Sequence, residues 1–91
     1  MAMAPFNTLF KSQWCHTCKQ LAPIVKELAA SFPDKLDYEE IDVTNNPDIA
    51  AQYEILSLPT LLAFKDGKIL ERFTGFTGKD KLIKKLNLAD N

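Results

Sequence analysis

The chain contains 91 residues, of which 46% are hydrophobic and 25% are charged, and this is the size and composition of one ordinary globular domain. Its 11 basic and 12 acidic residues leave a formal net charge of -1, so charge provides no argument for nucleic acid or an anionic membrane as a partner. No apolar run approaches the length of a membrane span, and the two cysteines are too few to staple a small secreted protein. We therefore expect a single domain over residues 1–91 that works in the cytoplasm.

The first expected elements are a strand and a helix. Residues 4–11 form a short apolar segment that leads to the cysteines and is interpreted as a strand. From residue 18 to residue 32, apolar side chains recur every three or four positions, which is typical of an amphipathic helix with one buried face. Pro23 is expected to bend this helix, because proline removes a backbone hydrogen bond, and Pro33-Asp34 is expected to end it.

A second strand and a short helix are expected next. Residues 36–43 read LDYEEIDV, and so many acidic side chains suit a strand at an exposed sheet edge, where charge discourages pairing with another chain. Residues 44–55 combine asparagines with an early proline, Pro47, which is the pattern of a capped helix start.

The clearest local pattern is a hairpin followed by a helix. Two apolar strands at 60–65 and 68–73 flank Asp66-Gly67, a pair that suits a tight turn between antiparallel strands. A last helix is expected over residues 79–88. Its buried face is expected to consist of Leu82, Ile83 and Leu86.

The resulting order of elements is β-α-β-α-β-β-α. A helix joins the first two strands, which predicts a parallel pair with a right-handed crossover, and the hairpin then adds antiparallel strands. The expected fold class is therefore α/β, with a mixed four-stranded sheet and helices on both faces.

The two cysteines, Cys15 and Cys18, are separated by two residues at the start of the first expected helix. Free backbone N–H groups and the positive end of the helix dipole favour an anion there, so the pKa of the Cys15 thiol is expected to fall. Cys18 lies one turn further in and is expected to be more covered. In a redox pair, Cys15 would attack a substrate disulfide and Cys18 would resolve the mixed disulfide. A C-x-x-C before a helix in a βαβ context is a strong signal for this chemistry.

The cysteine pair could instead have a structural or a metal-binding role. A structural staple is disfavoured, because a bridge that closes so short a loop removes little entropy from the unfolded chain. A closed zinc site needs four ligands, whereas the chain offers Cys15, Cys18 and His16, and His16 lies too close in sequence to join both thiolates on one ion. A symmetric dimer could still assemble four thiolates around zinc or an iron–sulfur cluster, and this alternative stays open.

The stretch QWCHTCKQLAP resembles the active site of the thioredoxin family. It has Trp14 directly before the first cysteine, Lys19 directly after the second, and Pro23 eight residues after Cys15. The stretch LSLPTLLAFKDGK is similar to the second signature of that family, and the resemblance covers nearly the whole chain. It implies a thioredoxin-like fold and a thiol–disulfide oxidoreductase.

The second signature carries expectations for the substrate groove. It implies a cis peptide bond between Leu58 and Pro59, with the proline facing the cysteines. Gly75 matches a glycine that the family places beside the same groove. Trp14 and Leu58 are expected to offer apolar contacts around the thiols, and the backbone of Leu58 is expected to bind an extended substrate peptide as an added strand.

The chain departs from the family in three places. Thioredoxins usually begin with an extra strand and helix for which this chain has no residues, so a minimal, glutaredoxin-sized member is expected. The usual Gly-Pro between the cysteines is replaced by His16-Thr17. Six residues before Cys15, where the family commonly carries a buried acid that assists proton transfer, stands Leu9.

These departures motivate two hypotheses. As a cation, His16 would pair with the Cys15 thiolate, stabilise the reduced protein and make the dithiol a stronger oxidant; the alternative is an exposed, neutral histidine with little influence. Glu40, on the strand beside the first one, would supply the acid that Leu9 does not; the alternative is a glutamate that simply faces water. Thr17, like Trp14 and His16, is expected to modulate the site.

The expected function is thiol–disulfide exchange with disulfide-containing proteins, carried out by a monomer without a bound cofactor or metal. Electrons would come from a thioredoxin reductase or from a small thiol. A glutathione-dependent, glutaredoxin-like activity is the nearest alternative. Compact size favours it, whereas Trp14, Pro23 and the sequence around Pro59 favour the thioredoxin type.

Overall fold

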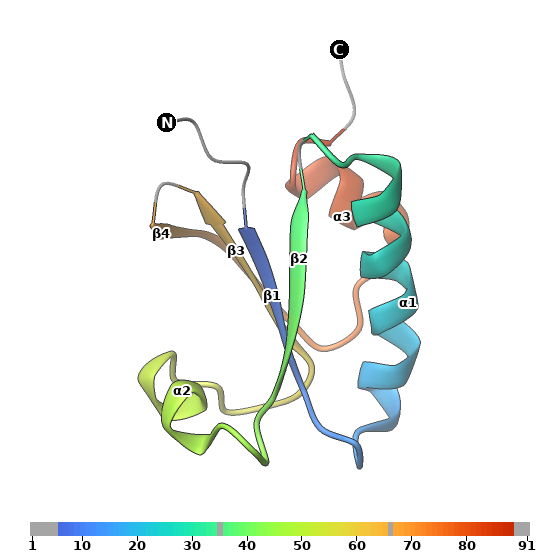
Figure 1. The fold of residues 1–91 in the computed structure, drawn as a ribbon. Helices are drawn as coiled ribbons and strands as arrows, with labels where there is room; N and C mark the ends of the chain where they lie inside the picture. The colour runs from blue at the N-terminus through green and yellow to red at the C-terminus, as the bar shows by residue number, and fades with distance from the viewer. Residues whose placement is uncertain (1–5, 35, 66, 89–91) are drawn as a thin grey trace.

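The computed structural model describes residues 6–34, 36–65 and 67–88, and within them it has four strands and three helices in the expected order. Figure 1 shows their arrangement. The elements are β1 (Phe6–Lys11), α1 (His16–Ser31), β2 (Asp37–Asp42), α2 (Pro47–Gln52), β3 (Thr60–Lys65), β4 (Lys68–Thr74) and α3 (Lys79–Lys85).

The four strands form one mixed sheet in the order β2-β1-β3-β4. β1 pairs with β2 in parallel, and β1–β3 and β3–β4 are antiparallel pairs. The predicted α/β class with a mixed four-stranded sheet is confirmed. The acid-rich strand β2 lies at an edge of the sheet, as its charge pattern predicts.

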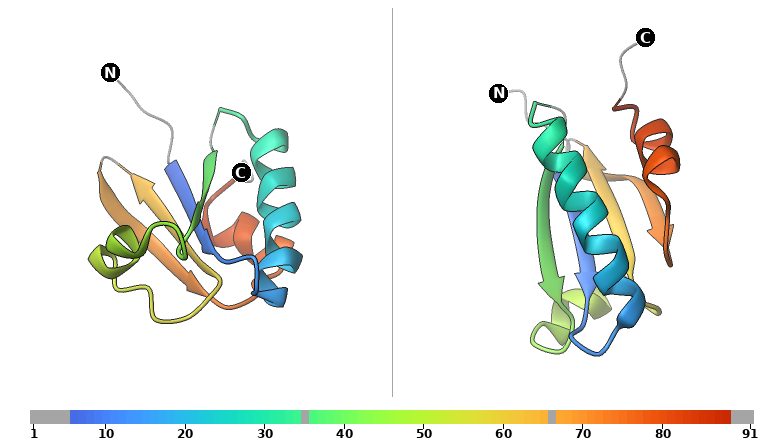
Figure 2. Two further views of the ribbon diagram at one scale, coloured as in Figure 1. Left: turned by 60° about the horizontal axis from the view of Figure 1, so that its bottom comes forward. Right: turned by 90° about the vertical axis from the view of Figure 1, so that its right-hand side faces the viewer.

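Helices cover both faces of the sheet, because apolar side chains of one strand alternate between the faces. Leu9 of β1 packs with Leu21 of α1 and Leu82 of α3 in the core cluster. The next residue, Phe10, points the other way and contacts the ring of Tyr53, which follows α2. Figures 1 and 2 accordingly show α1 and α3 on one side of the sheet and α2 on the other.

Helix α1 begins two residues before the first residue of its periodic pattern. The pattern predicts a start at residue 18, whereas the helix begins at His16 because Cys15 occupies the N-cap and its sulfur accepts a hydrogen bond from the Cys18 N–H. The capping residue, rather than the hydrophobic repeat, therefore sets the boundary. The helix continues through Pro23 to Ser31 and ends before Pro33-Asp34 as expected; the bend expected at Pro23 stays a prediction.

Helix α3 is shorter than its apolar pattern suggests. It ends at Lys85 instead of residue 88, because Asn87 adopts a left-handed conformation with φ +56°. The N–H groups of Asn87 and Leu88 then bond the carbonyls of Lys84 and Ile83 at 3.3 and 3.0 Å, which is a Schellman ending. Leu82 is fully buried, and Ile83 and Leu86 pack against the core at its margin.

The remaining local predictions concern α2 and the hairpin. Asn46 occupies the N-cap of α2 and Pro47 its first turn, but the Asn46 amide donates to the Asp42 carbonyl instead of capping the helix. The hairpin of β3 and β4 forms as predicted, with Gly67 at φ +79°. The other turn residue, Asp66, lies outside the described residues.

Candidate active site

Three segments meet at the end of the sheet where β1 ends. Phe10 of β1 pairs with Thr60 of β3, and Thr60 pairs with Thr74 of β4. The segment after β1, which carries the cysteines, therefore leaves the sheet at the same end as Pro59, which precedes β3, and Gly75, which follows β4 (Figure 1). Strand register thus assembles two motifs that are far apart in the sequence.

The cysteine pair lies at the start of α1 and forms a disulfide. Cys15 caps the helix, with an extended backbone, and its sulfur accepts a hydrogen bond from the N–H of Cys18 at 3.1 Å. The Cα atoms of the pair are 5.3 Å apart, within the range that a disulfide spans. Cys15 is half-buried and Cys18 is only 1% exposed. The structure therefore holds the oxidised pair with the more accessible sulfur outermost.

The first turn of α1 is suited to an anion at Cys15. It contains no acidic residue, so no carboxylate competes for the free N–H groups at the helix start. After reduction of the disulfide, the sulfur of Cys15 would carry its negative charge where one such N–H already points at it.

The predicted modulating residues surround the pair. Trp14 is 78% exposed, and its backbone N–H donates to the hydroxyl of the buried Ser12 at 3.3 Å. His16 is exposed at the first helical position, and Thr17 is half-buried. Their effect on the thiols stays a prediction.

The residues expected to line the substrate groove lie before β3 and directly after β4. The Leu58–Pro59 peptide bond is cis, the geometry that the resemblance implies, and the N–H of Gly75 donates to the Pro59 carbonyl at 2.9 Å. Gly75 has φ +82°, which favours glycine at this position. Pro59 is buried and Leu58 is half-buried, and the backbone N–H and C=O of Leu58 have no hydrogen-bond partner within the described part of the chain.

Two further exposed apolar residues flank this region and are not indicated by the sequence patterns. Leu56, three residues before Pro59, is 94% exposed, and Phe76, directly after Gly75, is 52% exposed. Apolar residues in two loops beside recognised motifs are the signal that could have identified them. Together with Trp14, they give this end of the molecule a set of exposed apolar side chains.

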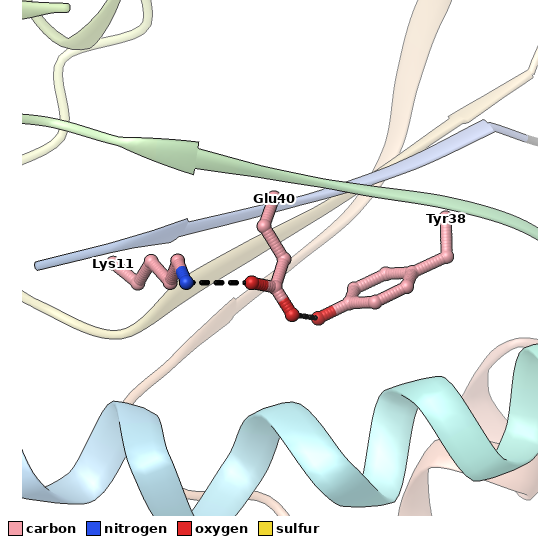
Figure 3. A network of polar contacts seen from close by, with 3 residues as sticks. All are labelled: Lys11, Tyr38 and Glu40. Carbon is pink, nitrogen blue, oxygen red and sulfur yellow. Dashed lines mark hydrogen bonds and ion pairs between the residues drawn. The ribbon is translucent and has the colours of Figure 1, made fainter. Parts of the chain in front are cut away.

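Glu40 takes part in a polar network on the edge strand (Figure 3). The Nζ of Lys11 lies 2.6 Å from the Oε1 of Glu40, and the hydroxyl of Tyr38 donates a hydrogen bond to Oε2. Partial burial raises the pKa of Glu40, but the hydrogen bonds from Lys11 and Tyr38 and the charges of Lys11 and Lys26 outweigh it, so the pKa lies below its ordinary value. Burial, followed by the bond to Glu40, raises the pKa of Tyr38.

The network bears on the hypothesis that Glu40 supplies the acid that Leu9 does not. Leu9, where the family commonly has a buried acid, is fully buried in the apolar core. The Glu40 carboxylate is ionised at neutral pH and already has two partners, so it is a weak proton donor. Proton transfer by Glu40 stays a prediction.

The structure indicates no metal site within one described chain, and the dimeric alternative stays untested. Among the residues that it describes, no group of three or more His, Cys, Asp and Glu side chains could hold a metal ion.

Within the same residues, no helix combines the length and apolar character that crossing a membrane requires.

The chain combines a Cys-x-x-Cys pair at the start of a helix with the element order β-α-β-α-β-β-α. This combination is that of a thiol–disulfide oxidoreductase. A sequence model of the thioredoxin family matches residues 5–88. Thioredoxins of Staphylococcus aureus, such as those of strains Mu50 and MW2, are 44% identical over 78 residues, which are 86% of this chain and 75% of theirs. The chain belongs to the thioredoxin family.

Solved structures share the fold at much lower sequence identity. One is described as a malarial protein; it has a TM-score of 0.87 at 21% identity, over 93% of this chain and 96% of that one. Another is thioredoxin-2, described as a component of the malaria parasite protein secretion machinery; it also has a TM-score of 0.87 at 21% identity, over 92% and 82% of the chains.

Replacing Glu40 by glutamine is expected to remove a stabilising contribution at neutral pH. Because the pKa of Glu40 in the folded protein lies below its ordinary value of 4.5, this contribution is present above that value and is lost as the pH falls through the folded-state pKa. Urea unfolding of both proteins across pH measures it. The difference in the free energy of unfolding should be largest near neutral pH and shrink toward acid.

The matched control is Glu39→Gln, on the same strand but outside the network. It should not show the pH-dependent difference. A Glu40→Gln difference that stays constant from neutral to acid pH would contradict the prediction.

Proposed function

We propose that the protein reduces disulfide bonds in other proteins by a two-step dithiol mechanism. The observation that carries this proposal is the position of Cys15, whose sulfur lies at the helix start and bonds Cys18. The Cys15 thiolate attacks one sulfur of the substrate disulfide, and the other substrate sulfur leaves as a thiolate that takes a proton from water. The Cys18 thiolate then attacks Cys15, the second substrate sulfur leaves, and the substrate has gained the two electrons that the new Cys15–Cys18 disulfide has lost.

Substrate docking is proposed at the loops beside the dithiol. The backbone groups of Leu58, which have no partner among the residues that the structure describes, support pairing with an extended peptide, because such groups can add a strand to an existing backbone. The exposed side chains of Trp14, Leu56 and Phe76 would cover the apolar parts of that peptide. Pro59 and Gly75, joined by a hydrogen bond, form the base of the proposed groove.

The proposal extends to the setting in which the protein works. Both cysteines come from one chain, which supports a monomeric catalyst. Repeated reduction of protein disulfides needs a donor that restores the dithiol, and such donors belong to reducing compartments. We therefore place the protein in the cytoplasm, with a thioredoxin reductase as the donor.

Substitution of each cysteine should separate the two steps. Cys15→Ser is expected to abolish reduction of a protein disulfide, because the attacking sulfur is lost. Cys18→Ser is expected to attack once and then remain joined to the substrate, because the resolving thiol is lost. Mass spectrometry detects this mixed disulfide. Turnover by Cys15→Ser, or a substrate joined to Cys18 in the parent protein, would contradict the assignment.

The donor is tested by comparing two ways of reducing the oxidised protein. Under the proposal, a flavoprotein thioredoxin reductase with NADPH reduces the Cys15–Cys18 disulfide rapidly, and glutathione does so slowly. Consumption of NADPH, with glutathione reductase coupled to the second reaction, reports both rates. Faster reduction by glutathione would favour the glutaredoxin-like alternative.

His16→Gly tests the influence of the residue between the cysteines. If a cationic His16 stabilises the Cys15 thiolate, its removal should make the redox potential more negative, by about 30 mV for a loss of about 1.4 kcal/mol. Equilibration with defined thiol buffers measures the potential. An unchanged or higher potential would show that the exposed histidine has no such role, and Thr17→Ala provides the control for a general change in the first turn.

A further inference from the structure

The two sulfurs of the dithiol have different surroundings. Cys15 is half-buried and receives the N–H of Cys18. Cys18 is 1% exposed, and its sulfur accepts no hydrogen bond within the described residues. Burial without a donor opposes ionisation of a thiol, yet the resolving step requires Cys18 as a thiolate. A positive charge from elsewhere in the fold would favour the thiolate of Cys18.

The alternation of β1 places Lys11 on the face of the sheet that α1 covers. Lys11 and Leu9 lie on the same face of the strand, and Leu9 packs with Leu21 of α1. Cys18 lies one turn before Leu21 on the buried face of α1. Because α1 runs in the opposite direction to β1 (Figure 1), Lys11 on the strand and Cys18 on the helix both lie closer to the connecting loop than the packed pair of Leu9 and Leu21.

The position of the Lys11 side chain is fixed by the edge strand. Its ammonium group forms the 2.6 Å ion pair with Glu40, and Tyr38 holds the second oxygen of that carboxylate. Tyr38 itself packs against the core cluster, so the network is anchored on the α1 side of the sheet. In Figure 3, Lys11 is at the end of the network toward the earlier turns of α1.

We propose that Lys11 stabilises the thiolate of Cys18 in the resolving step, and that Glu40 and Tyr38 are positioning residues that act through Lys11. The inference rests on the proposed function. Cys18 gives its proton to water, and its sulfur then bonds to Cys15 while the bond from Cys15 to the substrate breaks. The leaving substrate sulfur takes the electron pair and is protonated by water. Lys11 takes no part in the proton transfers and contributes charge alone.

Other charged or titratable groups lie near Lys11, Glu40 and Cys18, and the experiment has to account for them. Lys26 of α1 contributes to the field at Glu40, and His16 is exposed in the first turn. On β2, Asp42 pairs with Lys11 in the register, and its side chain accepts the N–H of Thr44 at 2.8 Å. Lys26 is the useful comparison, because it is a cation near Glu40 that does not form the ion pair.

The experiment follows the reduced protein as it reacts with dithionitrobenzoate, which releases one coloured thiol at each step. The first phase reports attack by Cys15 and the second reports resolution by Cys18. Lys11→Met should displace the pH profile of the second phase by about one pH unit toward alkaline values. At neutral pH the second phase should slow only about threefold, because the more basic thiolate is also more nucleophilic. The first phase should change less than about twofold.

The controls separate charge from structure. Lys11→Arg should restore the profile, and Lys26→Met should leave it unchanged. Glu40→Gln should displace the profile toward alkaline values by less than Lys11→Met does, because it also removes a negative charge that itself disfavours the thiolate. At high pH the second phase of Lys11→Met should equal or exceed that of the parent protein, which a merely structural defect cannot produce. Lys11→Gln is measured in parallel, so that a folding defect of one variant does not decide the result.

Two results would overturn the inference. One is an unchanged pH profile in both Lys11→Met and Lys11→Gln, and the other is a second phase slowed by the same factor at every pH. Absence of the first phase in the parent protein would instead refute the proposed function, so the two failures are distinguishable.

Discussion

The central constraint of this molecule is that the sulfur that begins a helix is also the one proposed to attack the substrate. Cys15 occupies the N-cap of α1, and its sulfur receives an N–H group that the helix would otherwise leave without an intrahelical partner. The same interaction favours a negative sulfur, which is the attacking form. Because β1 leads into this cap through a short loop, the position of the reactive sulfur follows from the packing of β1 against α1.

The ends of the sheet strands carry the second part of the proposed site, the surface for substrate contact. The register that aligns Phe10, Thr60 and Thr74 brings the segments of Pro59 and Gly75 to the end of the sheet where the dithiol lies. Backbone groups at Leu58 and exposed apolar side chains beside it are the groups proposed to contact a peptide. The helix start thus provides reactivity, and the strand ends provide the surface on which a substrate could be held.

Most of the fold could be predicted from the sequence, because hydrophobic period and turn residues are local signals. The strands and helices occur in the predicted order, and the pairing of the hairpin is as expected. Boundaries are less predictable, since Cys15 as a cap and Asn87 in a left-handed conformation set the ends of α1 and α3. The ion pair between Lys11 and Glu40 depends on the register between two strands that are distant in sequence, which no local pattern encodes. The exposed apolar residues of the two loops are hard to predict for a similar reason, because exposure is a property of the folded surface.

The fully buried Leu9 has a consequence for the architecture of the whole domain. The described core cluster consists of apolar side chains alone, so no group within it changes charge when the dithiol is oxidised or when the acidity of the medium varies. A buried carboxylate would couple cohesion of the interior to the reaction cycle, since its ionisation in a low-dielectric interior is costly. Here the ion pair of Lys11 and Glu40 lies at the edge strand, and Cys18 lies in the first turns of α1 outside the core cluster. The apolar packing around Leu9 is therefore the same requirement for the reduced and the oxidised protein.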